Sequence, residues 1–448
     1  MDGSPRSRLR VAVIGSGISG LSAAWLLSGK HDVTVFEKAA QPGGHSLTAD
    51  IDSAGKRVPV DMGFIVYNSP TYPNLTALFE HLGVKTHESE MSFGVSLDDG
   101  RIEYSGGDLR GLFAQPANLV SPRFWSMLAD LVRFYRNAAK DITALEQCGQ
   151  SLGDYLGSQN FGRPFIDDHL LPMAGAIWSA PAATMRDYPA AAFIRFFENH
   201  GLLKLTGRPI WRTVAGGSRA YVERLAAAMP GRLLRNCAAV SIGRDDAGVS
   251  IATSDGSSAR FDHVVLATHA DQALKLLAEP SPDERELLGA FRYSQNHAYL
   301  HTDGRLMPKR RAAWSSWSVL GKTGDAAAPL CVSYWMNRLQ GLTIAQDVFV
   351  TLNPASEIRA GAIMQTERFE HPLIDARAIA AQRRLWSLQG HRKTWFCGAY
   401  FGSGFHEDGL QSGLAVAEAL GGVRRPWSVP NESGRIHLTA MSRERLAA

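Results

Sequence analysis

A short apolar run near the start of the chain leads directly into a glycine-rich turn, and this feature limits the possible folds more than any other. Residues 11–14 read Val-Ala-Val-Ile, which is typical of a buried parallel strand, and residues 15–20 read Gly-Ser-Gly-Ile-Ser-Gly. Apolar and small side chains then recur at helical spacing at Leu21, Ala24 and Ser28. A strand, a glycine turn and a helix in this order predict the first unit of an α/β domain that binds a dinucleotide.

The three glycines of this turn have different physical roles. One permits the tight turn, one lets the main chain approach a pyrophosphate, and one lets the helix pack closely. The anion then lies at the helix N-terminus, where free N–H groups and the helix dipole favour it. A second apolar strand, residues 33–36, ends at Glu37, seventeen residues after Gly20, where a carboxylate can accept hydrogen bonds from both ribose hydroxyls. This order of elements supports a dinucleotide site far better than the glycines alone.

Paired glycines follow the acidic residue and indicate which dinucleotide is bound. Gly43 and Gly44 are followed by His45, Ser46 and Thr48, a pattern that resembles the extended fingerprint of the flavin amine oxidase superfamily. The resemblance implies FAD. Members of the family often carry Arg directly after the paired glycines, so with His45 this sequence lacks that fixed positive charge. The Ser-Gly-Gly-Cys segment that carries covalent flavin in some members is also missing from the sequence, and we therefore expect FAD to be bound non-covalently.

Two later segments resemble the same family. Residues 261–268 resemble the strand that returns the chain to the FAD domain, and residues 408–413, Asp-Gly-Leu-Gln-Ser-Gly, resemble the start of the C-terminal helix. In the family this helix points its N-terminus at the N1/O2 edge of the flavin, where negative charge accumulates on reduction. The resemblance implies that FAD is held by Gly15, Ser16, Gly17, Ile18, Ser19, Gly20, Glu37, Lys38, Gly44, His45, Met62, Gly63, Val240, Thr268, Gly398, Gly409, Leu410 and Gln411.

The resemblance covers nearly the whole chain and implies an α/β fold, α+β overall. A Rossmann-like FAD-binding domain is then interleaved with a substrate domain of mixed sheet and helices. We expect the FAD-binding domain to comprise residues 1–88, 208–285 and 390–448, and the substrate domain to comprise residues 89–207 and 286–389.

Residues 165–211 are unusually rich in bulky apolar groups, which a long apolar cavity or a plain helical core would both explain. The spacing of Phe193, Phe196 and Phe197 fits the core. Asn199 and His200 interrupt the apolar run, and we expect satisfied core polar groups there rather than catalytic ones. By resemblance, the residues nearest to cavity positions of the family are Trp178, Leu203, Ile210, Trp211 and Phe405.

The sequence departs from the amine oxidases where their chemistry takes place. In those enzymes a lysine that holds a water near flavin N5 lies in roughly the register of residues 291–301, where the nearest candidates here are Asn296 and His297. The tyrosine cage of the family departs as well, because Phe405 precedes the C-terminal helix. These departures weaken the case for an amine substrate.

A bacterial branch related to the N-terminal flavin region of plant cyclopropane-fatty-acid synthases is the closer resemblance. Residues 177–180, 199–203 and 404–409 are among the tracts that carry it. This kinship implies desaturation or double-bond isomerisation of fatty acyl chains, with hydride transfer to flavin N5. For the proton acceptor the sequence favours His406, with a pKa near neutrality, and Asn296 or Glu407 in polar support.

Three alternatives stay open: an amine or polyamine oxidase, a carotenoid-type desaturase, and a non-catalytic flavin- and lipid-binding partner of a lipid methyltransferase. In the leading hypothesis the expected partner is an acyl lipid or another apolar small molecule, and the alternatives differ from it in their partner. Anaerobic bleaching of the flavin by substrate would separate the enzymes from the non-catalytic binder.

Charge and composition exclude other functions. The net charge of +4 is small for 448 residues, and short basic clusters such as residues 309–311 do not form a nucleic-acid footprint; solvated surface charge or weak attraction to anionic lipid explains them. Four scattered cysteines without a C-x-x-C pair indicate neither a metal site nor a disulfide framework. We expect a cytoplasmic protein whose contact with the inner face of the membrane, if it occurs, is peripheral.

Overall fold

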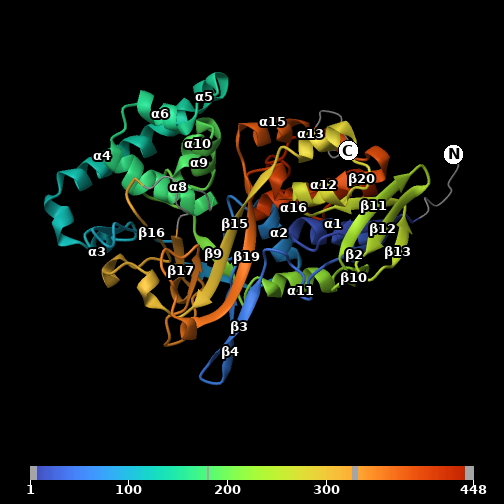
Figure 1. The fold of residues 1–448 in the computed structure, drawn as a ribbon, viewed down its shortest axis with the longest axis horizontal. Coiled ribbons are helices and arrows are strands. Elements are labelled where there is room, and N and C mark those ends of the chain that lie inside the picture. Colours follow the sequence, from blue (N-terminus) through green and yellow to red (C-terminus); the bar gives the residue numbers. More distant parts are fainter. Residues whose placement is uncertain (1–7, 179–180, 325–330, 439–448) are drawn as a thin grey trace.

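The computed structural model of the chain describes residues 8–178, 181–324 and 331–438. Ser179 and Ala180, which belong to the tract shared with the bacterial branch, lie outside the described residues. The ribbon divides into two halves, one around a parallel sheet and one around a larger mixed sheet with a group of helices beyond it (Figure 1).

The first half is built on a parallel sheet of five strands in the order β10-β2-β1-β14-β20. β1 lies at its centre and pairs with β2 and β14, and the apolar residues 11–14 are buried as the sequence predicts. The strand expected over residues 261–268 is shorter, because Phe261 belongs to a separate antiparallel sheet formed by β11, β12 and β13. The bounds are β1 Arg10–Ile14, β2 Asp32–Phe36, β10 Arg232–Leu234, β11 Ala239–Asp245, β12 Gly248–Thr253, β13 Ser258–Phe261, β14 His263–Leu266 and β20 Thr394–Phe396.

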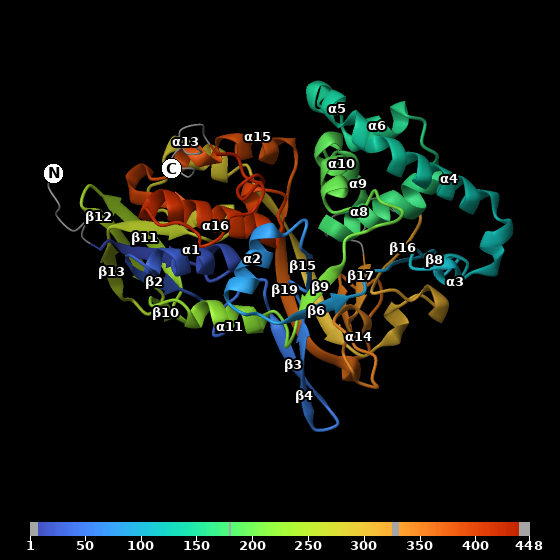
Figure 2. The ribbon, with the colours of Figure 1, turned by 180° about the vertical axis from the view of Figure 1, so that it is seen from behind.

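Two helices from opposite ends of the chain pack against each other beside this sheet. They are α1 (Ile18–Ser28) and α16 (His406–Gly421), and both views of the ribbon show them side by side (Figure 2). A Cβ atom at Gly413 of α16 would lie 2.2 Å from the carbonyl oxygen of Ser19 of α1. Only glycine allows such a close approach of two helix backbones. The remaining helices of this half are α2 Pro73–His81, α11 Arg219–Ala227, α12 Ala270–Leu276, α13 Pro282–Leu288 and α15 Ala376–Leu385.

The second half contains a seven-stranded sheet in the order β19-β15-β18-β17-β16-β7-β8, antiparallel except where β16 pairs with β7. The strand predicted over residues 291–301 is β15. The bounds are β7 Phe93–Leu97, β8 Ile102–Ser105, β15 Arg292–His301, β16 Trp317–Gly321, β17 Cys331–Trp335, β18 Phe349–Leu352 and β19 Ile363–Leu373. The helices are α3 Leu109–Leu112, α4 Pro122–Asn137, α5 Ile142–Cys148, α6 Leu152–Ser158, α7 Arg163–Phe165, α8 Leu171–Trp178, α9 Ala182–Arg186, α10 Ala190–Asn199 and α14 Met336–Leu339.

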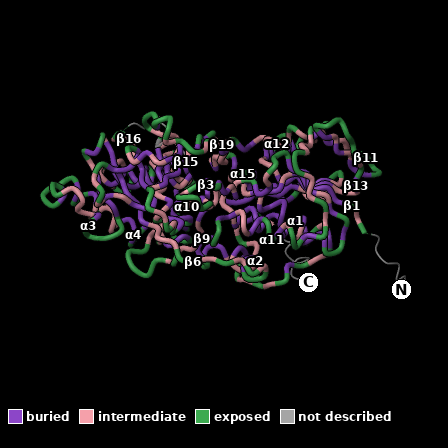
Figure 3. Tube along the Cα trace, turned by 90° about the horizontal axis from the view of Figure 1, so that it is seen from below, coloured by how far each residue is buried: buried purple, intermediate pink, exposed green. Residues whose placement is uncertain are grey.

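Smaller sheets and long strands join the halves. A hairpin of β3 (Thr48–Ser53) and β4 (Lys56–Asp61), and a sheet of β5 (Val66–Asn68), β9 (Trp211–Val214) and β6 (Thr86–Ser89), lie at the junction. Buried residues form a continuous interior through both halves (Figure 3). Helix α15, which precedes the boundary predicted at residue 389, packs against α13 and the turn at Ala399–Phe401, and the domain boundaries stay a prediction.

Candidate active site

The glycine turn lies at the carboxyl end of β1, in front of α1. Gly15 has φ +99° and donates its N–H to the Phe36 carbonyl at 2.9 Å. A Cβ at Gly20 would lie 2.0 Å from the Gly15 carbonyl oxygen, whereas a Cβ at Gly17 would meet nothing within 4 Å. Gly20 is thus required by packing inside the protein. Gly17 instead faces open space at the helix tip, which is what the approach of a phosphate to the backbone requires.

Glu37 is held in place by the same turn. Its Oε2 accepts hydrogen bonds from the Ser16 N–H at 2.9 Å and the Ser16 hydroxyl at 2.6 Å, and its Oε1 accepts one from the Ala39 N–H at 2.8 Å. These bonds fix the direction of a buried carboxylate at the end of β2. The arrangement fits a ribose, because a carboxylate oxygen with one partner can accept another hydrogen bond.

The second glycine pair lies against the first turn. Gly43 and Gly44 have φ values of +124° and +58°, and a Cβ at Gly44 would lie 3.2 Å from the Cα of Gly17. The Gly43 N–H also donates to the Ser16 hydroxyl at 3.2 Å. The two glycine loops, residues 15–20 and 43–44, are separated in the sequence but meet at the α1 tip, where both can face a diphosphate.

His45 contributes no fixed charge to these loops. Its ring lies 5.2 Å from Phe369, 5.5 Å from His371 and 6.0 Å from His269 between centroids, and its Nε2 is buried without a hydrogen-bond partner among the described residues. Burial, and then repulsion from His371, His269 and His406, lower the pKa of His45 to about 3. The imidazole is therefore neutral at pH 7 and surrounded by other rings.

The tip of α16 lies beside the tip of α1. A Cβ at Gly409 would lie 3.0 Å from the Ile18 side chain, so the first turns of both helices are in contact. Gly398, at the end of β20, donates its N–H to the Ser412 hydroxyl at 2.9 Å and joins the same region. The helix begins at His406, two residues before the expected start at Asp408. Two helix N-termini, with their free N–H groups, thus converge as a flavin dinucleotide requires.

The other expected cofactor residues lie around these tips with less specific geometry. Val240 falls at a β-bulge between Ala239 and Ser241, so its main chain is outside the regular ladder and free to contact a base. Met62 and Gly63 follow β4 next to His45, and a Cβ at Gly63 would lie 2.1 Å from the His45 carbonyl oxygen. Lys38 and Thr268 follow β2 and β14, and Leu410 and Gln411 lie in the first turns of α16.

His406 is half-buried and belongs to a hydrogen-bonded group. Its Nε2 lies 2.6 Å from the Tyr221 hydroxyl and 3.4 Å from the Ser46 hydroxyl, and its ring stacks on Phe64 with 3.9 Å between centroids. Burial lowers the pKa of His406 to about 3. The expectation of a near-neutral pKa is therefore wrong: desolvation disfavours the imidazolium, and the ring is neutral at pH 7.

Glu407 faces away from His406 and caps another helix. Its carboxylate accepts hydrogen bonds from the main-chain N–H groups of Asn74 at 3.1 Å and Leu75 at 3.0 Å, which lie in the first turn of α2. The Gln411 side chain donates to it as well, at 3.0 Å. This geometry assigns Glu407 to the N-terminus of α2 rather than to polar support of a catalytic base.

Asn296 is linked to a histidine that sequence reasoning missed. Its Nδ2 lies 3.1 Å from Nδ1 of His371 on β19, and its Oδ1 accepts a hydrogen bond from Asn353 at 2.8 Å. Burial, followed by repulsion from His269, lowers the pKa of His371 to about 4. Neither His371 nor Tyr221 was predicted, because their partners are 75 and 185 residues away in the chain and no local spacing reports such contacts.

An aromatic cluster reaches the α16 tip from the second half. The ring of Phe196 lies 4.6 Å from Trp178 and 4.8 Å from Phe405, the residue that directly precedes α16. Phe193 and Phe197 are fully buried, and the Phe193 ring lies 5.6 Å from Trp178, so the cluster continues into the core. Of the remaining residues expected near the cavity, Leu203 and Trp211 are half-buried and Ile210 is 62% exposed, so Ile210 lies outside this cluster.

His200 lies in this cluster with one nitrogen unsatisfied. Its Nδ1 is 2.9 Å from the Phe196 carbonyl oxygen, which can only accept, so Nδ1 carries the proton and Nε2 carries a lone pair. Nε2 is buried and has no hydrogen-bond partner among the described residues. The expectation of a fully satisfied core polar group is therefore wrong for this atom. Burial lowers the pKa of His200 to about 3, with a further contribution from Arg435.

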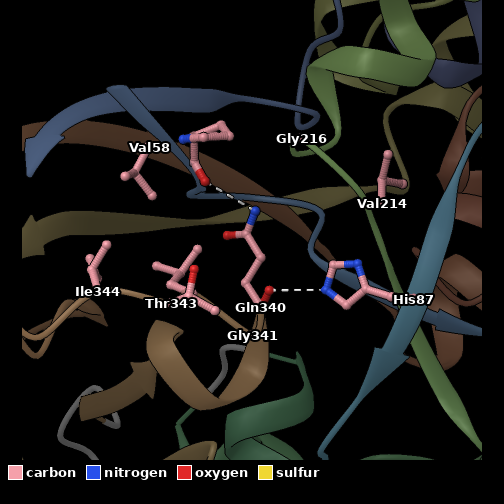
Figure 4. Close-up of a pocket in the computed structure, with 10 residues that line it drawn as sticks. Val58, His87, Val214, Gly216, Gln340, Gly341, Thr343 and Ile344 are labelled. Carbon is pink, nitrogen blue, oxygen red and sulfur yellow. Dashed lines mark hydrogen bonds between the residues drawn. The ribbon is translucent and has the colours of Figure 1, made fainter. Parts of the chain in front are cut away.

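A cavity of about 200 Å³ lies away from this site, between β4, β6, β9 and the residues after α14 (Figure 4). Gln340 closes it by donating to the Pro59 carbonyl at 3.3 Å and accepting from the Asp61 N–H at 3.0 Å. His87 lies 3.2 Å from the Gln340 carbonyl oxygen. Gln340 and His87 are thus engaged in hydrogen bonds, and none of the site residues expected from the sequence lines this cavity.

No helix in the described ranges is long and apolar enough to span a bilayer. Within the same ranges, no group of three or more His, Cys, Asp or Glu residues is arranged to hold a metal ion.

Comparison with known proteins places these features in a family. The model of the flavin-containing amine oxidoreductase family matches residues 18–395. A protein of Mycobacterium tuberculosis named as a flavin-containing monoamine oxidase, AofH, is 28% identical over 355 residues, which are 72% of this chain and 70% of that protein. Two solved structures share the fold. The fatty acid isomerase of P. acnes that produces CLA has a TM-score of 0.63 at 18% identity, covering 92% of this chain and 98% of its own. Cyclohexylamine oxidase from Brevibacterium oxydans has a TM-score of 0.62 at 17% identity, covering 92% and 100%.

Proposed function

The chain belongs to the flavin-containing amine oxidoreductase family and is an FAD-dependent oxidoreductase, and on this premise we propose that it acts on the fatty acyl chains of lipids. The reaction we propose is desaturation or movement of a double bond. The observation that carries the proposal is the aromatic cluster of Trp178, Phe196 and Phe405, which meets the α16 tip where the family places the flavin.

The surroundings of the α16 tip suit an apolar chain better than an amine. An amine is a cation near pH 7 and would be favoured by a free carboxylate, but the carboxylates nearest to the tip already have partners. Glu407 binds the first turn of α2, and Asp408 accepts from the Phe405 N–H at 2.8 Å and from Arg435 at 3.2 Å. The rings of the cluster offer apolar faces on which an acyl chain can be desolvated.

The relatives support two substrate classes. The P. acnes neighbour is titled a fatty acid isomerase, in agreement with the acyl proposal. AofH is named as a monoamine oxidase and is the reason to keep amine oxidation as a second candidate. Since both reactions remove a hydride from carbon, the same fold can serve either, and the residues around the substrate decide between them.

When FAD is bound, its ring supplies the acceptor for the hydride and its two electrons. The chain holds the cofactor at the α1 and α16 tips, excludes water with the aromatic cluster, and must accept a proton from the carbon adjacent to the one that loses the hydride. Two histidines can take that proton. Nε2 of His406 already faces the Tyr221 hydroxyl, whereas Nε2 of His200 carries a lone pair with no protein partner. We therefore propose His200 as the acceptor and His406, with Tyr221, as a group that orients the site.

The test is product analysis with the purified holoprotein. Under anaerobic conditions it is incubated with lipids that carry unsaturated acyl chains and, separately, with monoamines and polyamines. We expect a new or displaced double bond in the acyl chain by mass spectrometry, with flavin bleaching in the case of desaturation. Bleaching by an amine alone would establish the second candidate instead, and neither bleaching nor a changed lipid would indicate a non-catalytic binder.

Variants assign the proton acceptor. His200→Gln should lower turnover about 10²-fold or more while FAD content stays the same. His87→Gln serves as the matched control, because His87 lies at the separate cavity and should leave turnover unchanged. Full activity of His200→Gln would remove His200 from the mechanism.

A further inference from the structure

Exposed apolar side chains are concentrated at one end of the second half. Of the nine large apolar side chains that are well exposed in the described ranges, four fall within residues 109–125, here called the 109–125 tip. These are Leu109 (74% exposed), Leu119 (53%), Val120 (82%) and Trp125 (49%). Single exposed apolar residues are normal on a soluble protein, but four within 17 residues form a patch that needs an explanation.

The 109–125 tip is ordered and projects from the molecule. It consists of α3, the 3₁₀ turn Pro116–Val120 and the start of α4, at the end farthest from the parallel sheet (Figure 1). Asp108 caps α3 by accepting from the Gly111 N–H at 2.6 Å, and Ser121 caps α4 by accepting from the Phe124 N–H at 3.3 Å. Because the backbone is fixed by caps, the apolar groups are held outward by the fold and do not reflect a loose loop.

Trp125 is oriented as an interfacial residue. Its ring lies 6.0 Å from Phe113, and its indole N–H donates to the Leu119 carbonyl at 2.9 Å. The polar atom is thus satisfied while the ring remains half exposed. Tryptophan is favoured at the boundary between headgroups and acyl chains, because it combines a large apolar ring with one polar atom.

Basic residues outnumber acidic ones in the segment that contains the 109–125 tip and α4. Residues 101–140 contain six Lys and Arg but only three Asp and Glu, while the whole chain has a net charge of only +4. Acids engage part of this basic set: Arg123 pairs with Asp168, Arg133 pairs with Asp130, and Arg101 lies 3.9 Å from Asp98. Arg110, Arg136 and Lys140 have no ion pair among the described residues and remain available to headgroups. The basic residues of this segment are Arg101, Arg110, Arg123, Arg133, Arg136 and Lys140.

We propose that the 109–125 tip inserts into the surface of an anionic bilayer, with its apolar side chains below the headgroups and the basic residues of segment 101–140 against them. A convex apolar projection with basic residues in the same segment matches this partner, since apolar burial and attraction to anionic lipid act together. The surface of a folded protein would instead have to provide a complementary hollow. Docking by this tip would bring α4, and through it the helices that carry the aromatic cluster, close to the membrane.

The experiment is vesicle flotation of the FAD-loaded protein. Vesicles contain either phosphatidylcholine alone or phosphatidylcholine with phosphatidylglycerol. We expect at least tenfold stronger binding to the anionic vesicles, reduced by high salt, because the basic residues contribute through screened charge. Equal binding to both vesicles, or no binding to either, would overturn the proposal.

Matched substitutions locate the contact. Leu119→Glu with Val120→Glu should reduce binding to anionic vesicles at least tenfold, and Arg110→Ala with Lys140→Ala should reduce it less and only for anionic vesicles. The control is Met364→Glu on β19, because Met364 is also exposed (41%) but lies on another surface. An equal loss in the control would overturn the proposal, as would the appearance of a dimer in the wild type that the tip substitutions abolish.

This inference goes beyond the proposed function and can fail separately from it. Vesicle binding is measured without turnover, and acyl turnover can be measured in detergent without vesicles. A protein that binds anionic vesicles but changes no lipid would refute the proposed function alone. A protein that acts on detergent-dispersed lipid but ignores vesicles would refute the membrane contact alone. Far-UV circular dichroism and FAD content of each variant ensure that a loss of binding does not come from unfolding.

Discussion

Two buried polar groups, Glu37 beside the α1 tip and His200 in the aromatic cluster, have opposite surroundings. Around the α1 tip, Glu37 accepts three hydrogen bonds from Ser16 and Ala39, so the chain itself completes its surroundings. In the aromatic cluster, Nε2 of His200 has no partner among the described residues. Leaving a buried polar atom unpaired costs about 1–3 kcal/mol. The chain therefore engages both oxygens of the Glu37 carboxylate, whereas Nε2 of His200 keeps a lone pair with no partner among the described residues.

The largest effect should come from breaking the glycine turn at Gly20. A Cβ there would lie 2.0 Å from the Gly15 carbonyl oxygen, so Gly20→Ala must push α1 away from the turn. We expect a loss of about 3 kcal/mol or more in the free energy of unfolding, together with loss of FAD. Urea unfolding followed by circular dichroism measures the first, and the absorbance of the purified protein the second.

Gly17→Val is the matched control for this prediction. A Cβ at Gly17 meets nothing within 4 Å, so the fold should be kept while the larger side chain fills the space at the helix tip. The midpoint of unfolding without FAD should change little, but FAD affinity should fall strongly. Stoichiometric yellow flavin in Gly17→Val would show that the α1 tip does not hold the diphosphate.

The next largest effect should come from Glu407, which lies in the first turn of α16 and caps α2. Glu407→Ala would leave the N–H groups of Asn74 and Leu75 at the start of α2 without their acceptor. We expect a loss of about 2 kcal/mol in the free energy of unfolding, since a cap and a buried acceptor disappear together. Glu407→Gln keeps one amide oxygen and should lose less. If both variants lost activity but no stability, Glu407 would act in catalysis and not as a cap.

The sequence predicts the region around the α1 tip better than it predicts the aromatic cluster. Gly15, Gly17, Gly20 and Glu37 lie within one strand–helix–strand unit, so their spacing alone predicts the α1 tip and its elements. The fold class was confirmed, and the strand over residues 291–301 was placed within one residue. Local patterns succeed here because each one is formed by neighbours along the chain.

The remaining features arise from contacts that spacing does not encode. Glu407 binds Asn74 across 333 residues, and this contact, not the helix in which it lies, determines its role. His406 was expected to titrate near neutrality, but the burial that lowers its pKa is produced by Phe64 and Tyr221 from other segments. His200 was interpreted as satisfied because most buried polar groups are. Only the fold shows that one of its nitrogens is the exception.

Acid should destabilise the protein through its buried neutral histidines. The pKa values of His45, His200 and His406 fall from about 6.5 to about 3 in the folded state. Between these values the unfolded chain binds protons that the folded chain does not, so stability is lost as the pH falls from about 6.5 toward 3. Each such histidine contributes up to about 1.4 kcal/mol per pH unit.

Urea unfolding at about pH 8, 6.5 and 5 would measure this slope, because the ordinary histidine pKa of about 6.5 lies within that pH range. His406→Gln should make the slope shallower by the share of one histidine, whereas His87→Gln, for which the structure gives no comparable burial, should not. A stability that is flat between pH 6.5 and 5 would mean that these rings are more accessible to water than the fold indicates.

The smallest effect on stability should come from His200→Phe, which sharpens the comparison most. The substitution replaces an unpaired buried nitrogen with carbon and keeps a ring against Phe196, whose carbonyl oxygen still accepts the main-chain N–H of residue 200 at 3.0 Å. We expect the free energy of unfolding to change by less than about 1 kcal/mol. Turnover of an acyl substrate should nevertheless fall about 10²-fold or more, because the variant has no lone pair to accept the proton. A clear loss of stability with unchanged turnover would mean that His200 is an ordinary part of the core, and the second region would then resemble the first.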